Sequence, residues 1–253
     1  MIRFVGAGCG AADLITVRGQ RLLSEADVII YAGSLVNPEL LTCAKEGAAI
    51  YNSAEMTLEQ VLAVMFDAEK RGLTTVRLHT GDPCLYGAIR EQMDALDEKG
   101  IAYDYTPGVS SFCGAAAALN MEYTLPDVSQ SVVITRMAGR TPVPERESVR
   151  AFAAHRATMV LFLSTGLLEK TQAELIAGGY EPDTPAAIVY KATWPDERTF
   201  LCTVGTLAQC AAENGVKKTA LIVVGDAVRQ SGYARSELYN PAFATGFRPA
   251  AKE

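Results

Sequence analysis

Three short segments of the chain with the pattern of β-strands are each followed at once by a glycine-containing turn and then by a helical pattern. The segments are residues 2–5, 74–78 and 102–105, and the turns occupy 6–14, 80–87 and 106–112. Strands that alternate with helices in this way form a largely parallel sheet. The carboxyl ends of such strands lie on one edge of the sheet, which is where open α/β sheets bind ligands. We therefore predict an α/β fold in which the three turns share one ligand site.

The second of these turns reads Thr-Gly-Asp-Pro-Cys-Leu-Tyr-Gly over 80–87. Gly, Asp and Pro are common in ordinary turns, so this turn by itself does not identify a ligand. The carboxylate of Asp82 has two interpretations: it closes an Asx turn, or it accepts hydrogen bonds from ligand hydroxyls. His79 adjoins the turn, and both a local hydrogen-bonding role and a substrate role stay open for it.

The first turn, 6–14, formally matches the G-x-G-x-x-A pattern of dinucleotide-binding proteins. Such a site also uses an acidic residue near the end of the second strand to hold the ribose. Here the predicted second strand, 28–31, runs into Ala32, Gly33 and Ser34, with no carboxylate. We therefore favour a backbone-accommodating turn for another ligand over a nicotinamide or flavin site.

The composition excludes several other classes of protein. The net charge of −6 argues against a general nucleic-acid binder. The six cysteines are scattered and there are two histidines, so we expect reduced thiols and no metal site. No apolar run is long enough to span a bilayer, and the chain enters a strand at once, which leaves no room for a signal peptide. We predict a cytoplasmic protein without membrane contact.

The second half of the chain also alternates between strand and helix patterns. Strands are predicted at 131–135, 158–163, 186–190, 199–203 and 219–225, and we expect a mixed sheet. With 253 residues the chain is long enough for two domains, which we place at 1–125 and 126–253.

No set of catalytic nucleophile and base is visible, because there is no G-x-S-x-G motif and His79 and His155 are far apart. His155 follows a predicted helix and is expected to be solvated. Five cations lie near the predicted turns: Arg77, Arg90, Arg136, Arg140 and Lys191. Two of them, Arg136 and Arg140, share a Pro/Gly-rich loop, and guanidinium groups suit carboxylate or phosphate. This loop indicates an anionic small substrate.

Several stretches taken together resemble the tetrapyrrole methylases. The glycine turn and the Gly-Asp-Pro turn are typical of the whole superfamily. Stretches at 31–36 (Tyr-Ala-Gly-Ser-Leu-Val), 107–112 (Pro-Gly-Val-Ser-Ser-Phe), 135–142 and 190–195 (Tyr-Lys-Ala-Thr-Trp-Pro) follow in the family's order. The likeness covers nearly the whole chain.

The resemblance implies two α/β domains, S-adenosylmethionine in the cleft between them, and a homodimer. Carried over by position, the residues that would contact the cofactor are Cys9, Gly81, Asp82, Leu85, Ser110, Ser111, Leu163, Ala192 and Ala220. Related enzymes often have proline where this chain has Cys9; backbone contact should survive this change, although the turn loses rigidity.

The implied reaction is methylation of carbon 11 of precorrin-4, or of its cobalt form, in cobalamin biosynthesis. The stretch 191–195 favours the cobalt form. Positioning would supply most of the acceleration, so no general base is assigned. The carboxylates of the tetrapyrrole would need cations, for which the candidates are Arg90, Arg136, Arg140 and Lys191. Two alternatives stay open: methylation at another position or of another acceptor, and a non-catalytic sensor of a nucleotide-like ligand.

Overall fold

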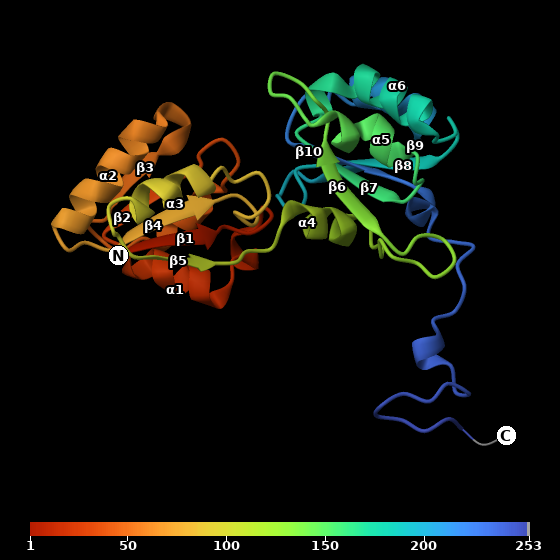
Figure 1. Ribbon diagram of the computed structural model, residues 1–253, viewed down its shortest axis with the longest axis horizontal. Helices are drawn as coiled ribbons and strands as arrows, with labels where there is room; N and C mark the ends of the chain where they lie inside the picture. Colours follow the sequence, from red (N-terminus) through yellow and green to blue (C-terminus); the bar gives the residue numbers. More distant parts are fainter. Residues whose placement is uncertain (252–253) are drawn as a thin grey trace. The chain divides into compact units, whose positions relative to one another are not determined.

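The computed structural model describes residues 1–251, and contacts within the chain divide it into two compact units (Figure 1). The first unit comprises Met1–Ala115 and Lys191–Glu197, and the second comprises Ala116–Tyr190 and the chain from Arg198 onward. A short segment late in the sequence thus belongs to the first unit. The predicted domains at 1–125 and 126–253 stay a prediction.

The first unit contains a five-stranded sheet in the order β3-β2-β4-β1-β5. All of its neighbouring strands are parallel, as predicted. The strands are β1 (Ile2–Gly6), β2 (Val28–Tyr31), β3 (Ala49–Asn52), β4 (Thr75–His79) and β5 (Tyr103–Thr106). The segments predicted at 2–5, 28–31, 74–78 and 102–105 correspond to β1, β2, β4 and β5, and each end lies within one residue of the prediction, because turn residues bound these short strands.

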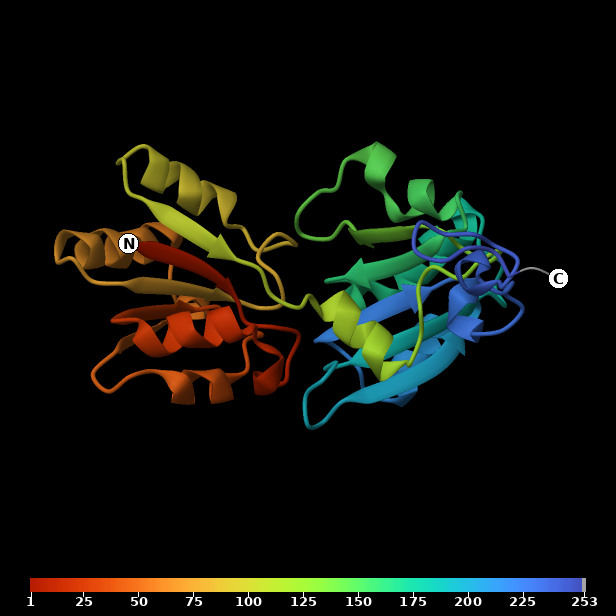
Figure 2. The ribbon, with the colours of Figure 1, turned by 90° about the horizontal axis from the view of Figure 1, so that it is seen from below.

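Helices cover both faces of this sheet (Figures 1 and 2). Helix α1 (Val17–Glu25) buries Leu22 and Leu23 against one face, in a cluster with Val5 of β1. Helices α2 (Leu58–Lys70) and α3 (Arg90–Asp97) pack on the other face, where Phe4 meets α2. Consecutive residues of a strand point to opposite faces, so a strand with apolar residues on both faces requires helices on both sides.

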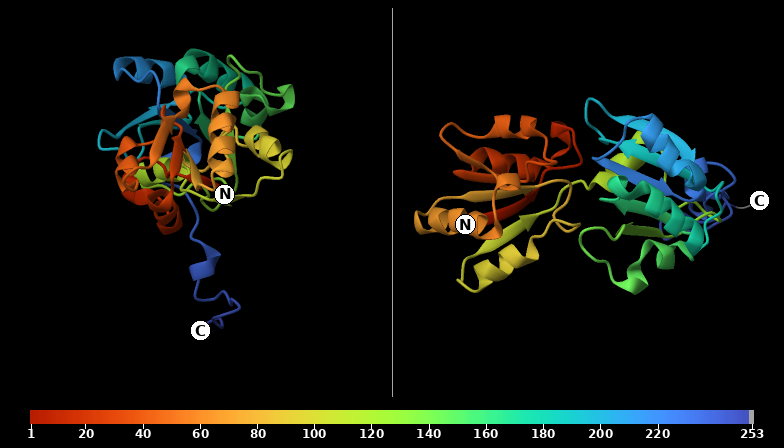
Figure 3. Two further views of the ribbon diagram at one scale, coloured as in Figure 1. Left: turned by 90° about the vertical axis from the view of Figure 1, so that its left-hand side faces the viewer. Right: turned by 90° about the horizontal axis from the view of Figure 1, so that it is seen from above.

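The second unit contains a five-stranded sheet in the order β6-β7-β10-β8-β9. Only β6 and β7 run parallel, and the other neighbours are antiparallel, which confirms the predicted mixed sheet. The strands are β6 (Val132–Arg136), β7 (Thr158–Phe162), β8 (Pro185–Tyr190), β9 (Arg198–Thr203) and β10 (Ala220–Val224). Helices α5 (Val149–Ala153), α6 (Leu168–Gly178) and α7 (Leu207–Glu213) lie against this sheet (Figure 3). Their apolar residues form one core with it.

The remaining helices are short. Helix α4 (Ser111–Ala118) follows β5 and continues across the boundary between the units. The segment Pro38–Cys43 is a 3₁₀ helix with proline at its start. The 3₁₀ helices are Ala12–Leu14, Pro38–Cys43, Ser53–Glu55, Glu145–Glu147, Thr165–Leu167, Val204–Thr206, Asp226–Arg229 and Glu237–Tyr239. Within residues 1–251, no helix has the length and apolar character needed to cross a bilayer.

Candidate functional site

Strands β1, β4 and β5 end together at the carboxyl edge of the first sheet. Gly6 of β1 is in register with His79 of β4, and Val5 is in register with Thr106 of β5. The turns that follow therefore start side by side, as the parallel arrangement predicts. Gly8 and Gly81 join two of them through paired backbone hydrogen bonds, with N···O distances of 2.8 and 3.3 Å.

Glycine is required at this edge because three backbone segments touch one another. A Cβ atom on Gly6 would lie 2.5 Å from the Cα of Gly108, and one on Gly108 would lie 2.2 Å from the carbonyl oxygen of Gly81. Neither position has room for a side chain. Gly81 also has a φ of +61°, which favours glycine. The third turn, around Gly108, is thus held against both others by backbone contact.

The carboxylate of Asp82 connects the second and third turns. It accepts a hydrogen bond from the backbone N–H of Cys84 at 2.9 Å, which closes the expected Asx turn, and one from the N–H of Gly108 at 2.9 Å. It also accepts from the hydroxyl of Tyr105. Burial acts to raise the pKa of Asp82, but the hydrogen bonds, first that from Tyr105, hold this pKa below its ordinary value.

A segment from the second half of the chain completes this edge. The hydroxyl of Thr193 accepts from the backbone N–H of Ala11 at 3.0 Å and lies 3.6 Å from the sulfur of Cys9. A Cβ atom on Gly10 would lie 2.6 Å from the carbonyl oxygen of Ala192. The segment 191–197 therefore packs on the glycine turn, and this brings Ala192 beside Cys9.

Seven of the predicted cofactor contacts lie in the first unit. A Cβ atom on Gly81 would lie 3.4 Å from the backbone nitrogen of Ser111, which begins α4, and Ser110 beside it is buried. Leu85 follows Asp82 in the same turn and is half-buried. The structure groups at this sheet edge Cys9, Gly81, Asp82, Leu85, Ser110, Ser111 and Ala192.

The other two predicted cofactor contacts, Leu163 and Ala220, lie in the second unit. Leu163 directly follows β7 and is 62% exposed, and Ala220 begins β10. Because Ile222 pairs with Leu161 in antiparallel register, Ala220 lies opposite Leu163. The hydroxyl of Thr165 donates to the carbonyl oxygen of Ala220 at 3.0 Å, which holds the two strand ends together.

The four predicted substrate cations differ in how far they are already engaged. Arg90 forms ion pairs of 2.8 Å with Asp94 and Asp97. Lys191 forms one of 2.6 Å with Asp196.

The other two cations come from the loop after β6. Arg136 donates to the carbonyl oxygens of Thr141 and Pro142, at 3.3 and 2.7 Å, and so holds this loop closed. Arg140 is exposed within the same loop. Arg140 is therefore better placed than Arg90 to receive a carboxylate from solution.

The two histidines have different environments. His79 is 4% exposed and stacks on Phe4, with ring centroids 6.3 Å apart. Burial, followed by the nearby charge of Arg77, lowers the pKa of His79 to about 3, so its imidazole is neutral at physiological pH. His155 is exposed beyond the end of α5. The buried Nε2 atom of His79 has no hydrogen-bond partner within residues 1–251, so the local hydrogen-bonding role is not seen at this atom.

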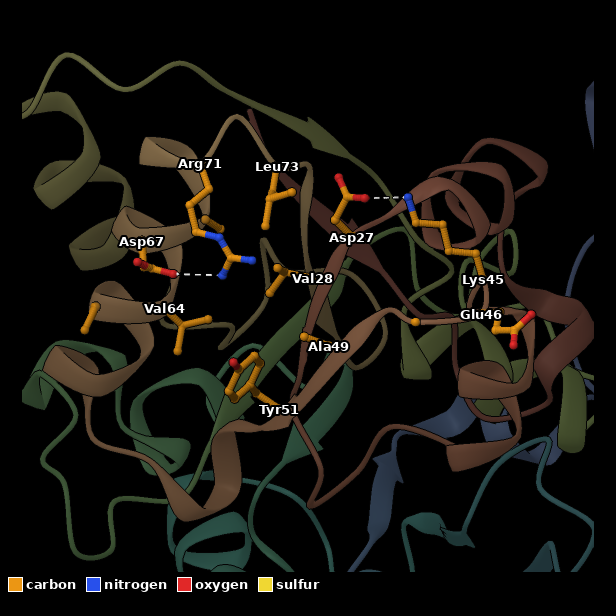
Figure 4. Close-up of a pocket in the computed structure, with 13 residues that line it drawn as sticks. Asp27, Val28, Lys45, Glu46, Ala49, Tyr51, Val64, Asp67, Arg71 and Leu73 are labelled. Carbon is orange, nitrogen blue, oxygen red and sulfur yellow. Dashed lines mark hydrogen bonds and ion pairs between the residues drawn. The ribbon is translucent and has the colours of Figure 1, made fainter.

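A hollow of about 490 Å³ lies at the opposite, amino edge of the first sheet (Figure 4). It is bordered by the starts of β2 and β3 and by α2. Four of its five charged side chains pair with one another: Lys45 with Asp27 at 2.5 Å, and Arg71 with Asp67 at 3.2 Å. Because it is remote from the three turns, this hollow is not the predicted site.

The sequence of residues 1–208 matches the model of the tetrapyrrole (corrin/porphyrin) methylases. The chain therefore belongs to this family, as the sequence motifs predicted. It is 50% identical to a cobalt-precorrin-4 C(11)-methyltransferase of Methanocaldococcus jannaschii, over 98% of this chain and 96% of that protein. It is 46% identical to a precorrin-4 C(11)-methyltransferase of a Sinorhizobium species, over 98% of both.

Solved structures agree with this assignment. The structure of a cobalt-precorrin-4 methyltransferase, a cobalamin biosynthetic enzyme, superposes with a TM-score of 0.88 at 46% identity, covering 90% of this chain and 95% of that one. A uroporphyrin-III C-methyltransferase from Thermus thermophilus, solved with S-adenosylhomocysteine, has a TM-score of 0.76 at 26% identity and covers 91% of this chain and 99% of that one. The predicted two-part α/β fold of the tetrapyrrole methylase type is confirmed.

Two residues at the sheet edge, Tyr105 and Thr193, were not among the predicted contacts. Tyr105 lies in β5, and the sequence of this strand does not indicate that its hydroxyl contacts Asp82. Thr193 lies in the Lys-Ala-Thr-Trp-Pro stretch, and this motif was the only local signal that could have drawn attention to it.

The buried neutral His79 predicts a specific pH dependence of stability. Its folded-state pKa of about 3 lies below the ordinary value, so on acidification the unfolded chain takes up a proton first and the native state loses stability. The variant His79→Gln should gain about 2 kcal/mol of unfolding free energy relative to the wild type between about pH 7.5 and about pH 5. Urea unfolding at several pH values measures this, with His155→Gln as the matched control. An unchanged difference between His79→Gln and wild type across this range would contradict it.

Proposed function

We propose that the protein is an S-adenosylmethionine-dependent methyltransferase that methylates carbon 11 of cobalt-precorrin-4 or precorrin-4 in cobalamin biosynthesis. The observation that carries this proposal is the 50% identity, over 98% of the chain, to a relative of that name. The site geometry agrees with it, because three glycine turns meet at the carboxyl edge of a parallel sheet, where α/β folds bind ligands.

The proposed cofactor contacts are the nine residues assigned from the motifs. These assignments are supported by the backbone cradle at the sheet edge, that is, the place where the three turns meet. A Cβ atom on Gly6 or Gly108 would fill this place. A cradle of backbone N–H and C=O groups with one carboxylate and two serines suits a polar ligand such as an adenosyl amino acid. The S-adenosylhomocysteine bound to the Thermus thermophilus relative supports the same cofactor class.

The residues of the site have positioning roles in this proposal. When bound, S-adenosylmethionine supplies an electrophilic methyl group that an electron-rich ring carbon can attack. No general base is assigned among the proposed contacts: the hydrogen bonds to Asp82 hold its pKa below the ordinary value, which makes its carboxylate a weak base. The contribution of this chain is to hold the two reactants in line and to exclude water, which lowers the entropic part of the barrier.

The carboxylates of the tetrapyrrole would be bound by cations of this chain. Arg140 is the first candidate because it is exposed on the loop after β6. Arg136 supports this loop through its carbonyl contacts. Arg90 and Lys191 would first have to exchange their own carboxylate partners for those of the substrate.

The assay for the reaction uses methyl-labelled S-adenosylmethionine with precorrin-4 and with its cobalt form. We expect label in the macrocycle, and NMR of the product should place the new methyl group at carbon 11. The form with the higher kcat/KM is the physiological substrate. Label at another ring carbon would overturn the assignment of position, and binding of S-adenosylhomocysteine without any transfer would favour the sensor.

Loss of Arg140 should weaken substrate binding without affecting the cofactor. We expect Arg140→Ala to raise the substrate Kd about tenfold, the effect of one charge-assisted hydrogen bond. Arg136→Ala should raise it at least as much, because the loop also loses its carbonyl contacts. Calorimetric titration measures both Kd values. Arg146→Ala is the matched control, since Arg146 lies nearby and pairs with Glu147. Unchanged substrate Kd values in both test variants would contradict the carboxylate clamp.

We further propose that the protein acts in the cytoplasm as a homodimer. The family resemblance supports the dimer, and six free cysteines within residues 1–251 suit a reducing compartment. Light scattering coupled to gel filtration should give twice the mass of the chain, and a mass of one chain over a wide concentration range would contradict the dimer.

A further inference from the structure

The hydroxyl of Tyr105 lies in the proposed cofactor site, where it donates a hydrogen bond to the Oδ1 atom of Asp82. Tyr105 belongs to β5, the strand that leads into the third turn, and its side chain is 36% exposed. The ring thus extends from the end of β5 to the turn after β4, although β1 lies between these two strands in the sheet. The function proposed above assigns no role to this hydroxyl.

The hydrogen bonds to Asp82 differ in what they depend on. Those from the N–H groups of Cys84 and Gly108 are backbone contacts, which the fold supplies whatever the side chains are. The hydroxyl of Tyr105 and the thiol of Cys84 also donate to this carboxylate, and the bond from Tyr105 lowers the pKa of Asp82 more than the bond from the Cys84 thiol does. A single substitution can therefore remove the Tyr105 contact and leave the turns intact.

The titratable groups that face Asp82 stay protonated at physiological pH. Within residues 1–251, Asp82 forms no salt bridge, and the titratable groups that face it are Tyr105 and Cys84. Burial raises the pKa of Tyr105, and the carboxylate of Asp82 raises it further, so the hydroxyl stays a donor at physiological pH. The hydrogen bond to Asp82 is the first cause that raises the pKa of the Cys84 thiol, which also stays protonated.

We propose that Tyr105 is a positioning residue, whose hydroxyl holds the carboxylate of Asp82 in one orientation toward the bound cofactor. This inference rests on the proposed function, because it is the cofactor that Asp82 would contact. A carboxylate that is already oriented loses less conformational freedom on binding, so the ligand binds more tightly. Loss of the hydroxyl should therefore weaken cofactor binding and make it more sensitive to acid.

The variant Tyr105→Phe removes only the hydroxyl. The matched control is Tyr103→Phe on the same strand, whose hydroxyl contacts Asp97 at 3.2 Å and not Asp82. In the ligand-free protein, carboxyl ¹³C NMR of labelled aspartate reports the titration of Asp82, assigned by its loss in Asp82→Asn. The pKa of Asp82 should rise in Tyr105→Phe and stay at the wild-type value in Tyr103→Phe. An unchanged Asp82 titration in Tyr105→Phe would overturn the inference, whatever the ligand.

Binding of S-adenosylhomocysteine tests the second half of the inference. Near neutral pH, Tyr105→Phe should raise its Kd by about tenfold, and the pH at which binding weakens should move upward with the pKa of Asp82. Tyr103→Phe should match the wild type. Equal binding by wild type and Tyr105→Phe at every pH would overturn the positioning role. If the wild type itself does not bind S-adenosylhomocysteine, the proposed function fails, and the NMR titration still decides the coupling between Tyr105 and Asp82.

Discussion

Direct backbone contact among Gly6, Gly81 and Gly108 controls the geometry of the candidate site. A Cβ atom on Gly108 would lie 2.2 Å from the carbonyl oxygen of Gly81 and 2.7 Å from the Cα of Gly6. Side chains at these positions would drive the turns apart, and the cost of such overpacking is commonly about 1–3 kcal/mol. The distance between the strand ends, and with it the width of the backbone cradle, is therefore set by the absence of side chains.

Glycine contact sets the spacing of the turns, and hydrogen bonds to Asp82 set their orientation. The carboxylate is held by two N–H groups at 2.9 Å, one in its own turn and one from Gly108 in the next. A charged acceptor with several donors binds them more strongly than a neutral one. The same contacts keep Asp82 ionised, which suits a residue that holds a ligand better than one that transfers a proton. This division of roles fits a family in which a methyl donor carries the reactivity.

The strands and turns could be predicted because their signals are local. The strand-forming segments that became β1, β4 and β5 are bounded by glycine or proline, and parallel pairing placed their turns on one edge without further information. The contacts of Thr193 could not be predicted in this way, since its hydrogen bond to Ala11 spans 182 positions. The contact of Tyr105 with Asp82 spans 23 positions and depends on the pairing of separate strands. Such contacts follow from the register of the strands, and the register cannot be read from a short window of residues.

The sequence by itself determined the fold class, the family and the order of the turns, because periodicity and motif spacing are properties of neighbouring residues. Only the tertiary structure decided that the segment 191–197 belongs to the first unit, and which charges are already neutralised. Arg90 and Lys191 look like free cations in the sequence, yet each has carboxylate partners, whereas Arg140 is exposed. Whether a charge is available to a ligand depends on distances of a few ångströms, and these distances arise only when the chain has folded.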